Sequence, residues 1–165
     1  MAVNEALQEL GFASGIKWPN DLLLNGKKIC GILCEMQADI ENVEWVVVGI
    51  GVNVNNTAFP AELQKTATSL LAESGKRQLR APIAALILQT FEANYQLFLQ
   101  KGFAPIRKKW LSHAVFLNKE ISISSAGELL LGKMSGIDDE GFLLLETENG
   151  VRRIASGDLA EGINQ

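Results

Sequence analysis

The dipeptide Asn25-Gly26 lies between two apolar runs, and it constrains the fold of this chain more than any other sequence feature. Residues 22–24 precede it, and residues 28–36 follow it with the sequence KICGILCEM. Both central residues of a type I′ turn need positive φ, which Asn-Gly supplies. We therefore predict an antiparallel hairpin of these two runs. Alternation along its second strand predicts that Cys30, Ile32 and Cys34 share one face.

The hairpin belongs to residues 17–55, around which we expect the rest of the chain to be organised. Residues 16–18 favour a strand before the bend at Pro19. A turn at residues 39–42 leads to residues 45–48, Trp followed by three valines, which we interpret as a central strand buried on both faces. These runs predict a sheet of three or more consecutive antiparallel strands.

Apolar residues recur at helical spacing in several other segments. Residues 2–10 form an amphipathic pattern that Gly11 ends, and a short helix is expected near residues 69–74. The longest helix is predicted for residues 82–102 and should cover one face of the sheet. A shorter one follows at residues 104–111. The first helix has nothing upstream to pack on, so we expect part of its domain to precede Met1.

The character of the sequence changes near residues 112–118. Beyond them, short alternating runs are separated by turn residues, which is typical of a small all-β barrel. The runs are residues 120–124, 128–134, 142–146 and 151–155. We predict an α+β chain with two domains, residues 1–114 and residues 115–165.

Composition limits the classes of function. The 165 residues are 47% hydrophobic and 21% charged, as in globular proteins. The net charge of -4 offers no basic field for a phosphate backbone, so nucleic acid is not expected as a partner. Cys30 and Cys34 are interpreted as two buried thiols. With neither a signal peptide nor a long apolar run in the sequence, we expect a soluble, cytoplasmic protein without a membrane partner.

The run Gly49-Ile50-Gly51 ends the third predicted strand. It is not a dinucleotide fingerprint, because Val54 stands where a third glycine would be and no helix follows. Glycines at a strand end can let a flat ligand approach the backbone. A simple bend in a packed strand explains them equally well.

Polar residues beside the hairpin are further candidates. Lys17, Lys27 and Lys28 lie near the turns, where lysines are usually solvated. Lys17 and Lys28 flank the Pro19 bend and the hairpin, so strand pairing could bring their ammonium groups together. Two such groups held close would favour a bound carboxylate or phosphate between them. Asn20, Asp21 and Asn53 usually serve the turns themselves. His113 is the only histidine, which argues against triad and zinc chemistry.

Three motifs at these residues resemble the biotin protein ligase family. They are KWPND at residues 17–21, KICGILCE at residues 28–35 and VGIGVN at residues 48–53. The resemblance covers essentially the whole chain and implies a mixed sheet like that of class II aminoacyl-tRNA synthetases, followed by an SH3-like barrel. It also implies that biotin and ATP, with Mg²⁺, form biotinyl-adenylate, and that biotin then passes to a lysine of a biotin carboxyl carrier protein.

The same resemblance assigns roles to the candidate residues. Lys28 would contact the biotin carboxylate and then the adenylate carbonyl, with Gly31, Gly49 and Gly51 lining the biotin site. Lys17 would neutralise phosphate, and Asn20 and Asn53 would face the adenylate or the metal. Asp21 would orient or deprotonate the incoming lysine. No residue is assigned as a metal ligand.

The chain also departs from the family pattern. The family carries a glycine- and arginine-rich loop upstream of the KWPND motif, and residues 1–16 hold no counterpart, so we expect the chain alone to make adenylate poorly. A DNA-binding domain is also not seen. The alternatives are a non-catalytic module that binds biotin or adenylate or docks a partner, and a related lipoate ligase. A homodimer formed edge to edge through the sheet is a further expectation.

Overall fold

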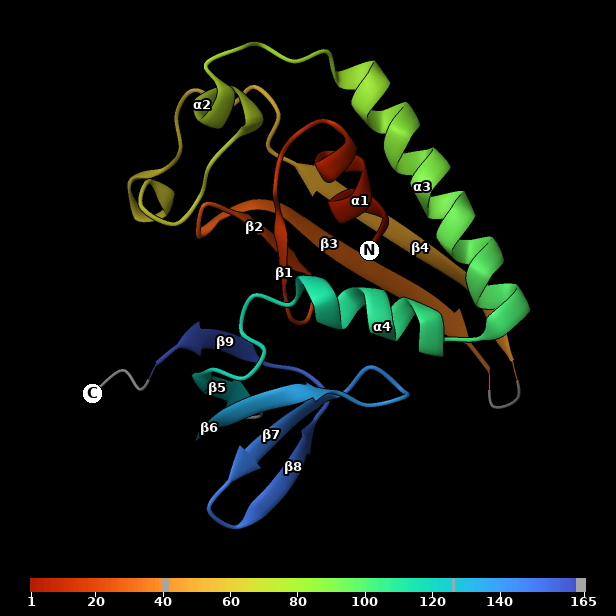
Figure 1. Cartoon of the computed structure of the whole chain (residues 1–165), viewed down its shortest axis with the longest axis vertical. Helices are drawn as coiled ribbons and strands as arrows, with labels where there is room; N and C mark the ends of the chain where they lie inside the picture. The colour runs from red at the N-terminus through yellow and green to blue at the C-terminus, as the bar shows by residue number, and fades with distance from the viewer. Residues whose placement is uncertain (40–41, 126, 163–165) are drawn as a thin grey trace.

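The protein is described by a computed structural model over residues 1–39, 42–125 and 127–162. Two sheets and four α-helices make up these residues (Figure 1). In chain order the elements are α1 (Ala2–Glu9), β1 (Gly15–Lys17), β2 (Asp21–Leu24), β3 (Lys27–Ala38), β4 (Val43–Val52), the 3₁₀ turn η1 (Ala61–Leu63), α2 (Leu70–Ser74), α3 (Arg80–Lys101), α4 (Ala104–His113), β5 (Glu120–Ser125), β6 (Glu128–Ile137), β7 (Leu143–Thr147), β8 (Gly150–Ile154) and β9 (Asp158–Glu161).

The first sheet has the strand order β1-β2-β3-β4. The predicted hairpin is confirmed: Asn25 has φ 50° and Gly26 has φ 76°, as a type I′ turn requires. The expected mixed sheet of the class II synthetase type is not confirmed. The four named strands pair antiparallel, because short turns join consecutive strands, and parallel pairing is seen in isolated bridges, Ile16 with Ala114 and Lys28 with Ala67. Of the predicted turn at residues 39–42, residues 40 and 41 lie outside the described part.

Helices α1 and α3 pack on one face of this sheet. Val3 and Leu7 of α1 meet Leu22 of β2 and Ile83 and Ile87 of α3 in one buried core. Only the first half of α3 covers the sheet as predicted, since all its buried residues lie there. Several apolar side chains along the helix are exposed, namely Leu88 in the first half and Phe91, Tyr95, Phe98 and Leu99 in the second. No helix in the described parts of the chain combines the length and apolar character needed to cross a membrane.

Strand β4 differs from its prediction. The valine run was expected to be central and buried, but β4 is the last strand of its sheet and is exposed along nearly its whole length. The expectation of two buried thiols is also wrong for Cys34, which is exposed while Cys30 is buried. Cys34 lies in the outer part of β3, where every side chain from Leu33 to Ala38 is exposed, and β4 forms one edge of the sheet (Figure 1).

The second sheet has the order β8-β7-β6-β5-β9 and encloses a separate core. Among the described residues it is an open antiparallel sheet, so the expected closed barrel is not confirmed. Strand β9 was not predicted, because its sequence DLAE has too few apolar residues to show a period. Trp18 of the KWPND motif is 5% exposed and belongs to this second core, which links the two sheets.

Candidate functional site

A bulge in β3 decides which way Lys28 points. Asp21 of β2 pairs with Gly31, but Leu23, two residues later, pairs with Lys28, three residues earlier on β3. In a regular strand Lys28 and Gly31 would point to opposite faces, because side chains alternate. The extra residue in β3 cancels this alternation, so Lys28 shares a face with Asp21 and Gly31.

Predicted site residues form one row across the first sheet. Lys17 of β1 pairs with Asp21 of β2, and Asp21 pairs with Gly31 of β3. Gly31 in turn pairs with Gly51 of β4. Residues paired directly across strands share a face, so the row presents an ammonium group, a carboxylate and two stretches of bare backbone together. The two glycines leave a floor on which a flat group can lie.

Lys28 and Asp21 form an ion pair above that floor. Lys28 Nζ lies 2.6 Å from Asp21 Oδ1, with the two side chains 48% and 17% exposed. The contact has the distance of an ion pair but not hydrogen-bond angles, so the buried Oδ1 has no hydrogen-bond partner among the described groups. Asp21 can thus still accept a hydrogen bond from a ligand.

Gly31 is required by this arrangement. A Cβ atom on Gly31 would lie 3.2 Å from Lys28 Cε and 3.3 Å from Lys28 Nζ. The same atom on Gly51 would lie 3.7 Å from the nearest heavy atom, the carbonyl oxygen of Gly31. The lysine therefore uses the space that a side chain at Gly31 would take.

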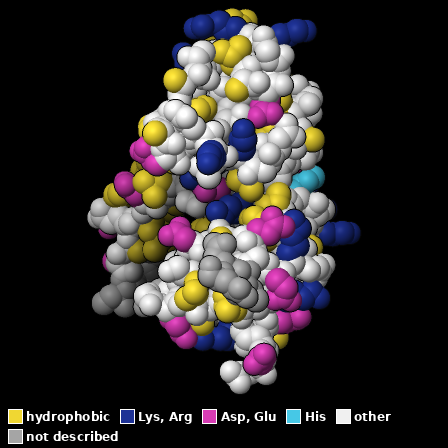
Figure 2. Space-filling view, turned by 90° about the vertical axis from the view of Figure 1, so that its left-hand side faces the viewer, with side chains coloured by type: hydrophobic (Ala, Val, Ile, Leu, Met, Phe, Trp, Pro, Cys, Tyr) yellow, Lys and Arg dark blue, Asp and Glu magenta, His cyan; other side chains and the backbone are white. Residues whose placement is uncertain are grey.

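These residues open into a cavity of about 680 Å³, a volume suited to a small molecule. Its lining joins the first sheet to residues 56–67 and to β9 of the second sheet. The lining residues include Lys17, Asp21, Lys28, Gly31, Gly51, Asn53, Phe59, Leu63, Phe116, Leu159 and Glu161. Figure 2 views the side of the molecule that carries α2 and β9, and basic and acidic side chains gather across the middle of this face.

One wall was missed by the sequence interpretation. Lys28 N donates to Thr66 O at 2.7 Å, and Thr68 N donates to Lys28 O at 2.9 Å. Leu70 N donates to Asn53 O at 3.0 Å, so the same short segment also fixes the backbone of Asn53, another predicted site residue. Its sequence, TATSLL, gave only the following helix as a signal.

Asn20 and Gly49 stand apart from the cavity lining. Asn20 Nδ2 donates to Ile32 O at 2.8 Å, which is the turn-serving role that such residues usually have. Gly49 pairs with Leu33 one row further along the same face. The structure therefore brings Lys17, Asp21, Lys28, Gly31, Gly51 and Asn53 together and leaves these two outside.

Cys30 also lines the cavity, but its thiol is inert at neutral pH. Burial raises the pKa of Cys30 to about 11, with a further contribution from the Asp21 carboxylate. A thiolate is the nucleophilic form, so Cys30 is not a candidate nucleophile.

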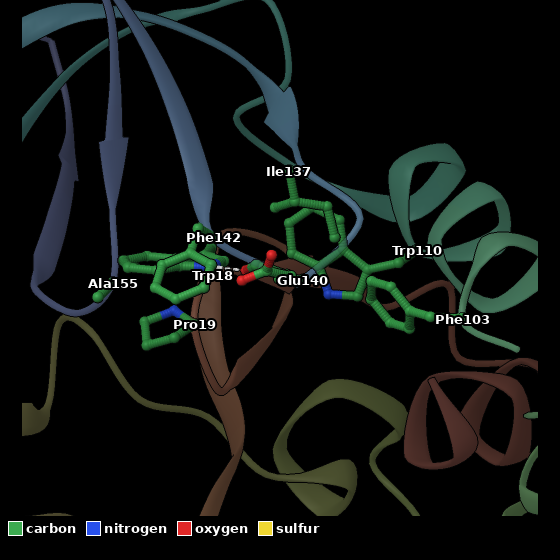
Figure 3. A pocket seen from close by; sticks show the side chains of 9 residues that line it. Trp18, Pro19, Phe103, Trp110, Ile137, Glu140, Phe142 and Ala155 are labelled. Carbon is green, nitrogen blue, oxygen red and sulfur yellow. Dashed lines mark hydrogen bonds between the residues drawn. The ribbon is translucent and has the colours of Figure 1, made fainter.

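A second hollow, of about 330 Å³, lies where α4 meets the β6–β7 turn (Figure 3). Trp18 and Phe142 lie on one side of it and Trp110 and Phe103 on the other, with Glu140 between them. Trp18 Nε1 donates to Gly141 O at 3.2 Å. The Glu140 carboxylate is paired with Arg153 at 2.7 Å, so its charge is compensated. Because most of the other lining side chains are apolar, we interpret this hollow as a packing junction and not as a charged site.

The fold and the site define a class of protein. It is an α+β protein whose small-molecule cavity carries a lysine, a carboxylate and a glycine floor between two antiparallel sheets. Two family profiles match this chain: the Biotin/lipoate A/B protein ligase family over residues 1–53, and the Biotin protein ligase C terminal domain over residues 116–159.

Curated relatives agree with the profiles. The Bifunctional ligase/repressor BirA of Bacillus spizizenii is 45% identical over 154 residues, which are 92% of this chain and 47% of that protein. The Biotin--[acetyl-CoA-carboxylase] ligase of Paracoccus denitrificans is 36% identical over 163 residues, 93% of this chain and 68% of the relative. The chain thus spans about half the length of the BirA relative and two thirds of the other.

Solved structures give the same result. Biotin protein ligase from Aquifex aeolicus has a TM-score of 0.87 at 31% identity, with 98% of this chain and 71% of that chain covered. The same enzyme in complex with biotin and ATP has a TM-score of 0.85 at 30% identity, covering 98% and 68%. The chain therefore belongs to the biotin protein ligase family.

Proposed function

We propose that this chain acts as a biotin protein ligase. The reaction has two steps: the biotin carboxylate attacks the α-phosphate of ATP, giving biotinyl-adenylate and pyrophosphate, and a lysine amine then attacks the adenylate carbonyl and releases AMP. The acceptor lysine belongs to a biotin carboxyl carrier protein. The observation that carries the proposal is Lys28 beside the Gly31–Gly51 floor, in one cavity of a member of this family.

Lys28 is the central catalytic residue in this proposal. Its ammonium contacts the biotin carboxylate and then the carbonyl oxygen on which negative charge develops, where a fixed cation is most effective. Gly31 and Gly51 let the ring system of biotin lie on the backbone, and we retain Gly49 as a neighbouring contact. The biotin and ATP complex of the Aquifex aeolicus ligase supports these substrates.

The remaining candidates act on the nucleotide and on the acceptor. Lys17 neutralises phosphate from its end of the row, and Asn53, with Asn20 as a weaker candidate, contacts the adenylate. Asp21 orients the incoming lysine, and its 2.6 Å contact with the Lys28 ammonium supports its ability to hold such a group.

The residues at hand do not form a magnesium site by themselves. Among the described residues no group of three His, Cys, Asp or Glu side chains could hold a metal ion. The carboxylates of the cavity, Asp21 and Glu161, are paired with Lys28 and Lys119. We therefore assign no residue of this chain to Mg²⁺, which usually binds through nucleotide phosphates and few protein ligands.

The test compares Lys28→Ala with Lys27→Ala, its neighbour outside the cavity lining. With biotin, ATP and Mg²⁺, adenylate formation should fall roughly a hundredfold for Lys28→Ala and stay near the parent rate for Lys27→Ala. Equal rates in the two variants and the parent would overturn the assignment of Lys28. A parent chain that neither forms adenylate nor binds biotin would overturn the proposed function.

A binding module is the second outcome of the same experiment. Biotin at a hundred times its dissociation constant stabilises a binding protein by about 2.7 kcal/mol, which thermal unfolding detects. Stabilisation without adenylate would identify a biotin-binding or partner-docking module. Because one matching profile covers both biotin and lipoate ligases, lipoate is tested in parallel. A response to lipoate alone would assign a lipoate ligase.

A further inference from the structure

Glu73 of α2 connects two segments that lie on either side of Lys28. Its Oε1 accepts a hydrogen bond from Thr68 Oγ1 at 2.5 Å, and its Oε2 accepts one from Asn25 Nδ2 at 2.6 Å. Asn25 is in the hairpin turn just before Lys28, and Thr68 lies beside Lys28 in the adjoining wall. One carboxylate therefore joins the turn, the wall and α2.

The wall holds Lys28 through its main chain. Lys28 N donates to Thr66 O, and Thr68 N donates to Lys28 O. These two hydrogen bonds form an isolated parallel β-bridge between Lys28 and Ala67. On its other side Lys28 pairs with Leu23 of β2. The backbone of the lysine is thus fixed between two partners at the position where the bulge turns its side chain into the cavity.

Loss of the Glu73 hydrogen bonds would destabilise this region. Thr68 is 3% exposed, so without its acceptor the hydroxyl group would be left buried and unpaired. Hydrogen bonds from Thr68 and then from Asn25 hold the pKa of Glu73 below its ordinary value. The group is therefore a carboxylate at neutral pH, and its hydrogen bonds are of the strong, charge-assisted kind.

We propose that Glu73 is a positioning residue for Lys28. By tying the Asn25 turn to the residues 66–68 wall, it sets the position from which the Lys28 ammonium reaches the biotin carboxylate. The role in catalysis rests on the proposed function, whereas the anchoring of Lys28 can be measured without it.

Hydrogen exchange at the backbone amides of Lys28 and Thr68 tests the anchoring. Glu73→Ala should raise both exchange rates roughly tenfold or more, since a charge-assisted hydrogen bond is lost on each side. The amide of Met134, bonded to Lys119 O in the second sheet, should keep its rate. Glu62→Ala, which removes a carboxylate from η1 a few residues before the wall, should leave all of these rates unchanged.

Glu73→Gln separates geometry from charge. Its amide oxygen can accept from Asn25, and its amide nitrogen can donate to the Thr68 hydroxyl, so the bridge survives with a different donor pattern. We expect it to restore most of the protection at Lys28. Two results would overturn the anchoring: exchange rates at Lys28 and Thr68 that Glu73→Ala leaves unchanged, or rates that Glu62→Ala raises as much as Glu73→Ala does.

Adenylate kinetics test the positioning. Glu73→Ala should lower kcat about tenfold or more, because small misplacement of a catalytic group is costly, with KM for ATP within about twofold of the parent. A structural role alone would reduce only the fraction of active protein, which active-site titration corrects. Raised exchange with a normal kcat would overturn the catalytic part. If the parent forms no adenylate, the proposed function fails, and the exchange rates still decide the anchoring.

Discussion

At the scale of single residues, the decisive feature is the extra residue in β3 that turns Lys28 toward the cavity. The sequence offered three lysines near the hairpin, and only the resemblance to the biotin protein ligase family singled out Lys28 among them, because alternation alone does not place its side chain in a site. Strict alternation would have placed Lys28 on the face of Cys30, which is the buried face. The trace of the bulge in the sequence is the consecutive apolar pair Ile29-Cys30, and both of these residues are buried.

The space at Gly31 gives a prediction with a built-in control. Gly31→Ala places a methyl group 3.2 Å from Lys28 Cε, whereas Gly49→Ala places one 3.5 Å from its nearest neighbour, the carbonyl oxygen of Leu33. The lysine end is flexible, so both variants should unfold within about 0.5 kcal/mol of the parent in urea. Gly31→Ala should weaken biotin binding, measured by calorimetry, more than Gly49→Ala, because Gly31 lines the cavity and Gly49 lies outside its lining. Equal affinities for the two variants would contradict the role of this space.

At the scale of elements, burial of β4 was the largest error of the sequence interpretation. Valines favour strands wherever they stand, but they do not report how many layers cover the strand. Val46 and Val47 are each 54% exposed, and β4 has a partner on one side only among the described strands. An exposed apolar edge favours pairing with another chain, which keeps the expected edge-to-edge homodimer as a prediction.

Substituting the valines tests their exposure. Val46→Thr and Val47→Thr keep the shape and the strand preference, so each should change the free energy of unfolding by less than about 0.5 kcal/mol. Val3→Thr buries a hydroxyl in α1, where the side chain is 1% exposed, and should cost about 1 to 3 kcal/mol. Urea denaturation measures all three. A large cost at Val46 or Val47 would mean that β4 is covered in solution.

At the scale of the whole molecule, Trp18 joins the two sheets. It follows Lys17, an end of the cross-strand row, yet its indole is buried in the core of the second sheet and bonded to Gly141. β9 contributes to the cavity from the other direction through Leu159 and Glu161. The cavity is therefore shared by both sheets, and its shape depends on how they pack.

Removing the Trp18 side chain should weaken both units. We expect Trp18→Ala to lower the free energy of unfolding by about 3 to 5 kcal/mol, the usual cost of emptying a large buried site. Trp45→Ala is the matched control, because Trp45 is 46% exposed and should cost much less. Urea denaturation followed by circular dichroism measures the difference. Similar losses for the two variants would contradict the linking role of Trp18.

The sequence by itself determined the features that depend on neighbouring residues. The Asn25-Gly26 turn, the helices near residues 2–10, 69–74 and 104–111, and most strands of the second sheet follow from local φ preferences and from periodicity. The three motifs also indicated the family that the comparisons establish.

Only the tertiary structure decided which of these residues meet. The face of Lys28, the edge position of β4, the wall of residues 66–68 and the place of Trp18 all depend on contacts between segments distant in the chain. Such contacts are chosen by burial of apolar surface and by pairing of polar groups across the whole molecule, which a local pattern does not encode.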